Sequence, residues 1–163
     1  MLFQATHKTP IGELFLVSDE HILLASGFRS FKDLLARMDQ ADAKREVKSV
    51  KNIPIISDLI SDYFAGDLTA LGGIKVRQSG AEFSQEVWKA MRKIPVGKTW
   101  SYSDLADRAG SPNAVRAAGT ACAKNLIAPI VPCHRVVKSG GALGNYGYGL
   151  EVKEWLLQHE GAI

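Results

Sequence analysis

The side chain best suited to covalent chemistry in this sequence is Cys133, which lies in the apolar run LIAPIVPCHRVV. The thiolate is the nucleophilic form of cysteine, and a neighbouring imidazole or guanidinium lowers the pKa of the thiol. His134 and Arg135 therefore suit a reactive cysteine. Adjacent residues of an extended strand point to opposite faces, so the run alone does not establish that Cys133 touches His134. On these residues alone, a reactive and a structural role for Cys133 both stay open.

Two segments after Cys133 could complete a reactive site. The loop SGGALGNYGYG carries five glycines around Tyr146 and Tyr148. Glycines let the backbone approach a ligand closely, and a tyrosine ring can stack on a base. The final predicted helix, LEVKEWLLQHEG, carries Lys153 and Glu160. A carboxylate beside a histidine holds the ring in one tautomer and stabilises its cation, so a cysteine, a histidine and a glutamate are available together.

A pair of short predicted helices precedes these residues and would position them. SYSDLADRAG has Ser101 and Asp104 at the spacing of a capping box, and Gly110 ends this helix. Ser111 as N-cap and Pro112 in the first turn predict that a second helix starts at once. Two short helices joined by a turn that contains glycine are typical of a helix-turn-helix.

The second helix, PNAVRAAGTACAKN, has unusually small side chains and is predicted to run to about residue 124. Its alanines and one glycine leave it thin, while Arg116 stands alone on the early turns. A thin helix can approach a neighbouring backbone closely, and that neighbour could be DNA or another part of the protein. Both interpretations stay open. We interpret Cys122, on the same helix, as a small buried residue.

The first half of the chain has a different pattern of predicted elements, with strands as well as helices. Short extended runs, LFQAT, ELFLVS and ILLAS, surround a hairpin signal at Asp19-Glu20. Helices are predicted over 30–38, with Ser30 as N-cap, and over PIISDLISDYFAG, with Pro54 near the first turn and Gly66 as the stop.

The two halves together predict an α/β protein. FSQEVWKAMRKI repeats apolar residues at helical spacing, and GGIKVRQSG (72–80) is interpreted as a linker. We therefore expect a small mixed α/β domain over residues 1–76. A mainly helical domain with the helix-turn-helix should cover residues 77–163.

Composition and charge limit the class of protein. Two cysteines cannot form a disulfide framework, and the sequence shows neither a secretory signal nor an apolar run long enough to span a membrane. We expect a cytoplasmic protein, or a nuclear one in a eukaryote. Residues 1–80 hold ten basic and ten acidic residues, whereas residues 81–163 hold ten and seven, so the excess of +3 lies in the second half. This favours a polyanionic partner, although so small an excess could also carry no meaning.

The motif IVPCHRVV resembles the signature of the O6-alkylguanine-DNA alkyltransferases, the methylated-DNA–protein-cysteine methyltransferases. The similarity covers nearly all of residues 83–161. VWKAMRKIPVGKTWSYSDLA, the thin helix with Arg116, Asn125 and GNYGYGLEVKEWLLQHEG follow in the family's order and spacing. In the first half only TPIGELFLVS and DYFAGDL are similar, which fits the family's variable first domain.

The resemblance implies direct-reversal DNA repair. O6-alkylguanine is flipped out of duplex DNA and its alkyl group passes irreversibly to the cysteine, so guanine is restored and the protein acts only once. The alkyl group comes from DNA, so we expect no cofactor. No cysteine lies in the first half to build a thiolate zinc site, so we also expect no metal. The expected partner of the monomer is duplex DNA with O6-alkylguanine, and O4-alkylthymine stays open.

The resemblance also assigns catalytic roles. Cys133 would accept the alkyl group, His134 would act on it as a base through a water, and Glu160 would orient the histidine. Asn125 would fix the turn after the thin helix. Tyr102 would give a proton or a hydrogen bond to the leaving guanine, and Lys153 would stabilise its O6.

DNA contact and base recognition are implied at two further places. Arg116 would fill the gap left by the flipped nucleotide, from a helix that enters the minor groove. The residues expected to contact DNA are Arg116, Ala114, Val115, Ala117 and Arg135, and those expected to bind the guanine are Val136, Tyr146, Gly147 and Tyr148. Tyr148 stands where many relatives have a small residue, which implies a narrower pocket.

Three other classes are weighed against this one. Alkyltransferase-like proteins bind the lesion without repairing it but lack the cysteine that stands in PCHR. A helix-turn-helix regulator would not need a cysteine, a histidine and a glutamate at these spacings. A Cys-His hydrolase would need an oxyanion hole, and the sequence shows no candidate for one.

Overall fold

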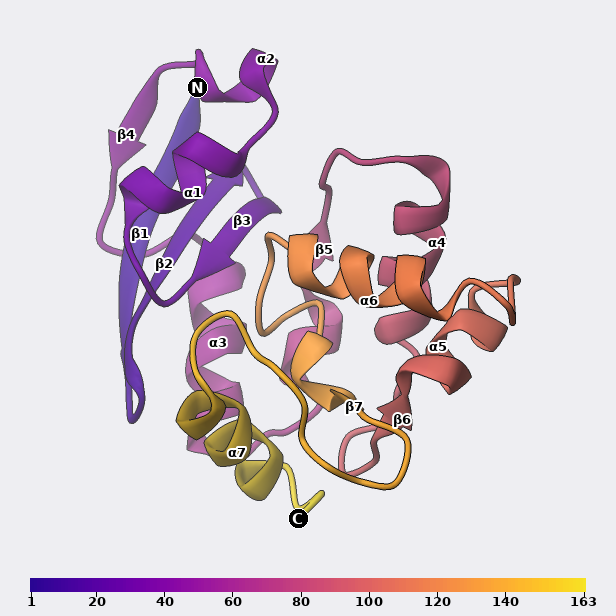
Figure 1. Cartoon of the computed structure of the whole chain (residues 1–163). Helices are drawn as coiled ribbons and strands as arrows, with labels where there is room; N and C mark the ends of the chain where they lie inside the picture. Colours follow the sequence, from indigo (N-terminus) through magenta and orange to yellow (C-terminus); the bar gives the residue numbers. More distant parts are fainter. The chain divides into compact units, whose positions relative to one another are not determined.

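The computed structural model describes residues 1–163, and the chain divides into two compact units (Figure 1). The N-terminal unit comprises Met1–Ser79 together with Leu126–Ile130. The C-terminal unit comprises Gly80–Asn125 and Val131–Ile163. The predicted boundary after residue 76 lies three residues before the first of these divisions, and the return of residues 126–130 to the N-terminal unit was not expected. None of the helices is both long and apolar enough to span a membrane.

A five-stranded mixed sheet forms the N-terminal unit, in the order β4-β1-β2-β3-β5. The three long antiparallel strands are those predicted from the extended runs: β1 (Leu2–Thr9), β2 (Gly12–Asp19) and β3 (Ile22–Gly27). Glu20 adopts a φ of 53° in the tight turn between β2 and β3, which confirms the hairpin signal. The short edge strands, β4 (Val47–Ser49) and β5 (Lys75–Val76), pair in parallel with β1 and β3. The predicted linker 72–80 therefore contains a strand, because its Lys-Val pair extends the sheet.

Helices cover both faces of this sheet. Phe15 of β2 packs edge-on against Phe31 of α1 (Phe31–Arg37), and His7 of β1 stacks on Phe64 of α3 (Ile56–Ala65). His7 pairs with Leu14, the neighbour of Phe15, so the two helices lie on opposite faces. The unit also contains α2 (Gln40–Ala43) and the 3₁₀ turn η1 (Ala70–Gly73).

The predicted ends of these helices are largely confirmed. The Ser30 hydroxyl accepts a hydrogen bond from the Asp33 amide at 3.0 Å, and Gly66 ends α3 with a φ of 120°. Pro54 lies two residues before α3, near its first turn as predicted, and Ile55 at a φ of 72° is the N-cap.

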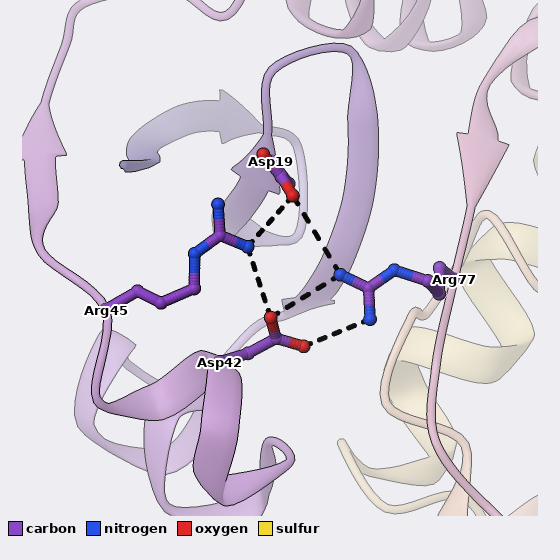
Figure 2. A network of polar contacts seen from close by, with 4 residues as sticks. All are labelled: Asp19, Asp42, Arg45 and Arg77. Atoms are coloured by element: carbon purple, nitrogen blue, oxygen red, sulfur yellow. Dashed lines mark hydrogen bonds and ion pairs between the residues drawn. The ribbon is translucent and has the colours of Figure 1, made fainter.

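A four-residue charge network holds one end of the N-terminal unit (Figure 2). Arg45 Nη1 lies 2.9 Å from Asp19 and 3.2 Å from Asp42, and Arg77 Nη1 lies 3.1 Å from Asp42. These residues come from the end of β2, from α2, from the segment before β4 and from the segment after β5. Hydrogen bonds from Arg77 and Arg45 lower the pKa of Asp42, and the bond from Arg45 lowers that of Asp19. The network therefore joins three regions that are distant in sequence: the end of β2, the stretch from α2 to β4, and the segment after β5.

Residues 126–130 extend the edge of β3. The Ser26 amide donates to the Leu126 carbonyl at 2.9 Å, and the Ala128 amide donates to the Ser26 carbonyl at 3.2 Å. The Ser26 hydroxyl adds a bond to the Ala128 carbonyl at 2.8 Å, and Gln78 accepts from the Leu126 amide at 3.0 Å. This segment is thus held by backbone and side-chain groups of the N-terminal unit.

The C-terminal unit is mainly helical, as predicted. Its helices are α4 (Glu82–Met91), α5 (Tyr102–Arg108), α6 (Val115–Lys124) and α7 (Leu150–His159). The parallel pair β6 (Trp100–Ser101) and β7 (Val136–Val137) joins the start of α5 to the segment that follows Cys133. The 3₁₀ turn η2 (Cys133–Arg135) immediately precedes β7.

The helix-turn-helix is present as α5 and α6. The capping box is confirmed, because Ser101 and Asp104 each accept a hydrogen bond from the other's amide at 3.0 Å. The predicted start of the second helix at Ser111 is wrong. A turn occupies the next residues, and α6 begins only at Val115, after an N-cap that makes no side-chain bond.

We expect Asp42→Asn to lower the free energy of unfolding by about 1 kcal/mol at pH 7, because two guanidinium groups lose their charged partner. The pKa of Asp42 is lowered in the folded state, so this stabilisation is present above the ordinary carboxyl pKa. It is lost as the pH falls through the lowered value.

Urea unfolding at about pH 7, 5 and 3 measures this contribution, and the difference from wild type should shrink towards the lowest pH. Asp39→Asn is the matched control, since Asp39 is exposed and makes no capping bond. A difference that persists undiminished at the lowest pH would show that the charge of Asp42 does not stabilise the fold.

Candidate functional site

Cys133 is the first residue of η2 and is half-buried. The side chain of Asn125, which ends α6, donates to the Val131 carbonyl at 2.8 Å and to the Cys133 sulfur at 3.3 Å. An amide donor beside a sulfur stabilises the thiolate more than the thiol, since a hydrogen bond to an ionised acceptor is the stronger one. Asn125 thus ties the end of α6 to the turn that presents the cysteine.

His134, the next residue, belongs to a buried hydrogen-bonded cluster with Glu160 and Arg135, which we call the relay. His134 is fully buried, and its Nε2 lies 2.9 Å from Oε2 of Glu160, which follows the last turn of α7. His134 Nδ1 is buried as well and makes no hydrogen bond in the structure. Sequence reasoning left a contact between Cys133 and His134 open because it placed both in an extended strand. They lie instead in a 3₁₀ turn, and the strand starts at Val136.

Arg135 completes the environment of Glu160. Its Nε donates to Oε1 at 2.8 Å, its Nη2 donates to Oε2 at 3.0 Å, and its Nη1 donates to the Ile94 carbonyl at 3.0 Å. This geometry argues against the predicted contact of Arg135 with DNA: the residue is only 7% exposed, and three of its N–H groups donate to acceptors inside the protein. Sequence reasoning missed this role because nothing in the motif indicates which acid an arginine meets.

The pKa values in the relay follow from burial and these bonds. Burial would raise the pKa of the Glu160 carboxyl, but hydrogen bonds from His134 and Arg135 outweigh it and hold the pKa far below its ordinary value. Burial lowers the pKa of His134, against the opposite pull of Glu160. The resting state is therefore an ionised Glu160 beside a neutral imidazole.

Tyr102 and Lys153 both lie beside the middle of the glycine-rich loop. A Cβ placed on Gly144 would lie 3.6 Å from the Tyr102 hydroxyl, and one on Gly119 of α6 would lie 3.8 Å from its ring. Burial, and then the electrostatic influence of the nearby Cys122 and Cys133, raises the pKa of Tyr102, which keeps it a hydrogen-bond donor. Lys153 Nζ is buried and donates to the Val136 carbonyl at 2.7 Å and to the Asn145 carbonyl at 3.4 Å.

The loop tyrosines lie against each other. The rings of Tyr146 and Tyr148 are 5.8 Å apart and nearly perpendicular, and both residues are half-buried, whereas Gly147 between them is exposed. Gly144 and Gly149 adopt positive φ values of 77° and 102°, which a side chain would strain. The loop conformation therefore depends on its glycines.

One face of α6 is exposed and carries small or basic residues. Arg116 and Ala117 are exposed, Val115 is 36% exposed, and Ala114 just before the helix is half-buried. The opposite face is buried through Ala118 and Ala121, and the indole of Trp88 in α4 donates to the Ala121 carbonyl at 2.9 Å. The thin helix thus packs inside the protein on one side and stays available on the other, which reconciles the two interpretations of its small residues.

Cys122 differs from Cys133. It is half-buried, and its sulfur lies 3.8 Å from the Met91 sulfur. Burial raises the pKa of the Cys122 thiol, which disfavours the nucleophilic thiolate. Of the two cysteines, Cys133 is therefore the one placed for chemistry.

Comparison with known proteins identifies the family to which the chain is similar. The family model described as the DNA-binding domain of 6-O-methylguanine DNA methyltransferase matches residues 82–162. The methylated-DNA–protein-cysteine methyltransferase of Salmonella typhimurium is 39% identical over 99% of this chain and 97% of its own length. That of Methanosarcina acetivorans is 37% identical over 99% of both chains.

Solved structures give the same result. The crystal structure of Mycobacterium tuberculosis OGT in complex with DNA matches with a TM-score of 0.83 and 34% identity, over 98% of this chain and 93% of that one. The O6-methylguanine-DNA methyltransferase of Pyrococcus kodakaraensis shares the fold, with a TM-score of 0.69 at 21% identity. With relatives this similar along its whole length, the chain belongs to the methylated-DNA–protein-cysteine methyltransferase family.

Proposed function

We propose that Cys133 accepts the alkyl group of O6-alkylguanine in duplex DNA and that the chain repairs one lesion per molecule. The observation that carries this proposal is the arrangement at η2. A half-buried thiol receives an amide hydrogen bond and is followed directly by a buried His–Glu–Arg cluster. The names of the relatives supply the reaction, and the DNA complex of Mycobacterium tuberculosis OGT supports DNA as the partner.

The transfer is a single displacement at the alkyl carbon. The Cys133 thiol gives its proton to His134 through a water, the sulfur forms a bond to carbon, and the bond from carbon to O6 breaks. Guanine leaves with the electron pair and takes a proton at O6 or a ring nitrogen. The product is a thioether, which no group in the site can cleave. The reaction therefore balances without a cofactor, and one alkyl group consumes one molecule, which we propose acts as a monomer.

Tyr102 and Lys153 would act on the leaving guanine. Tyr102 stays protonated and can donate to the developing negative charge. An ammonium group has three donors, and two of those on Lys153 go to the Val136 and Asn145 carbonyls, so the third is left for O6. Burial lowers the pKa of Lys153, which makes its proton easier to give up to the leaving group.

DNA would bind along the exposed face of α6. A base inside the stack hides its O6, so the nucleotide must be flipped out, at a cost of a few kcal/mol. Arg116, exposed near the start of α6, would fill the gap, while Ala114, Val115 and Ala117 would approach the backbone. Backbone groups near Val136 and Gly147 would read the flipped guanine, with Tyr146 and Tyr148 against the base and its alkyl group.

The identity of the acceptor is tested by replacing each cysteine. Cys133→Ser should abolish transfer of labelled methyl from O6-methylguanine DNA while DNA affinity stays near that of wild type, because a serine hydroxyl is a far poorer nucleophile at neutral pH. Cys122→Ser is the matched control and should transfer normally. Label on the Cys133→Ser protein, or its loss in Cys122→Ser, would reverse the assignment.

The role of Arg116 is tested by comparing two substrates. If the side chain fills the vacated stack, Arg116→Ala should slow repair of duplex DNA about tenfold or more, while the reaction with free O6-benzylguanine base stays unchanged. Lys124→Ala, an exposed basic residue on the last turn of α6, is the control for charge. Equal losses on both substrates would mean that Arg116 supports the fold or the pocket instead.

The effect of Tyr148 on the pocket is tested with a bulky alkyl group. If its half-buried ring lines the space beside the sulfur, Tyr148→Gly should raise the rate with O6-benzylguanine and leave the rate with O6-methylguanine DNA nearly unchanged. The methyl reaction of the same variant reports that it is folded. Unchanged benzyl reactivity in that folded variant would place Tyr148 outside the pocket.

A further inference from the structure

Of the cysteine, histidine and arginine side chains of the PCHR motif, that of Arg135 is the one that the proposed transfer leaves without a role. It is buried and makes two hydrogen bonds to the Glu160 carboxylate and one to the Ile94 carbonyl. Oε2 of Glu160 is shared, since it accepts from Arg135 Nη2 at 3.0 Å and lies 2.9 Å from His134 Nε2. The arginine and the histidine therefore act on the same carboxylate.

The histidine can receive the thiol proton at one atom only. Its Nε2 is turned to Glu160, so the proton acceptor has to be Nδ1, which makes no hydrogen bond in the structure. A neutral imidazole carries one N–H and one lone pair, and the lone pair is at Nδ1 only while the hydrogen is at Nε2. The reaction therefore requires Glu160 ionised and His134 neutral at the same time.

The charge of Arg135 makes this combination stable in a buried site. The positive charge of Arg135 balances the negative charge of the ionised Glu160, so with a neutral His134 the three side chains carry no net charge. Without it, a buried carboxylate faces a neutral ring, and the pair gains stability by taking up a proton. Whether that proton rests on the ring or on the carboxyl, Nδ1 ends up protonated, because a protonated Glu160 donates to Nε2 and forces the other tautomer.

We propose that Arg135 is a positioning residue that keeps Glu160 ionised and His134 neutral, so that the Nδ1 lone pair stays available for the thiol proton. This inference rests on the proposed function, because it concerns the proton that Cys133 releases. It replaces the contact of Arg135 with DNA that the resemblance implied.

The charges of Arg135 and Lys153 around His134 also favour its neutral form, because they lower its pKa. Glu160 and Lys153 approach it from the end and the first turns of α7, and Arg135 is its neighbour in η2. Burial lowers the pKa of His134, Glu160 raises it, and the charges of Arg135 and Lys153 lower it. Removing the charge of Arg135 therefore raises the pKa of the His134–Glu160 pair.

The test is the pH dependence of a single turnover. Wild type, Arg135→Met, Arg135→Gln and Arg135→Lys each react with free O6-benzylguanine, which needs no DNA binding, and the Cys133 adduct is followed by mass spectrometry. The acid limb of the rate profile should move upward by about 1 pH unit or more in the Met and Gln variants, since both remove the charge. At a pH below both acid limbs, a limb that has moved by about 1 pH unit should lower the rate about tenfold, and the rate should recover at higher pH. Arg135→Lys keeps the charge and should keep the limb near that of wild type.

The outcomes separate the two proposals. Recovery of the Met and Gln variants at high pH shows that they are folded, which a purely structural loss would not allow. An acid limb that stays in place in both variants refutes the inference, as does a normal reaction with free base combined with weakened duplex binding. A wild-type protein that places no benzyl group on Cys133 refutes the proposed function itself.

Discussion

The buried carboxylate of Glu160 is the constraint on which the site depends. A lone ionised carboxylate in the interior is costly, and three hydrogen bonds from two neighbouring residues of η2 offset that cost. Those bonds attach the end of α7 to the turn that carries Cys133 and, through the Ile94 carbonyl, to the segment after α4. The same hydrogen bonds therefore set the charge state of the relay and hold three segments of the C-terminal unit together.

A second constraint holds the cysteine itself. Asn125 joins the end of α6 to Val131 and to the sulfur of Cys133 across a span of eight residues. Between Asn125 and Val131 the chain belongs to the N-terminal unit, where Ser26 and Gln78 bind it. The hydrogen bonds of Asn125 thus connect the turn with the thiol to α6, the helix proposed to lie on DNA. A movement of α6 would therefore change the position of the Cys133 sulfur.

Much of the fold follows from local sequence signals. Short extended runs predict β1 to β3, and the Ser30 cap and the Ser101–Asp104 capping box predict where helices begin, because these signals act over a few residues. The local signals that gave a wrong prediction lie where tertiary contacts determine the structure. Ser111-Pro112 is a good helix start that the turn between α5 and α6 does not use, and Lys75-Val76 becomes a strand only because β3 offers an open edge.

The site shows the same limit. Cysteine, histidine and glutamate were predicted as partners, and the bond of His134 to Glu160 is present. The position of Arg135 could not be predicted, because a buried arginine and one that contacts DNA look alike in a sequence. Long-range pairs of charges, such as Arg135 with Glu160 or Arg77 with Asp42, are decided by the fold and not by spacing.

The single use of Cys133 as the acceptor is tested most directly by the mass of the intact protein after incubation with an excess of O6-methylguanine DNA. A single-use acceptor should reach a plateau at one added methylene mass per chain, located on Cys133 by peptide mapping, while restored guanine appears in equal amount. Continued formation of guanine beyond one per chain, or a methyl group on any other residue, would contradict it.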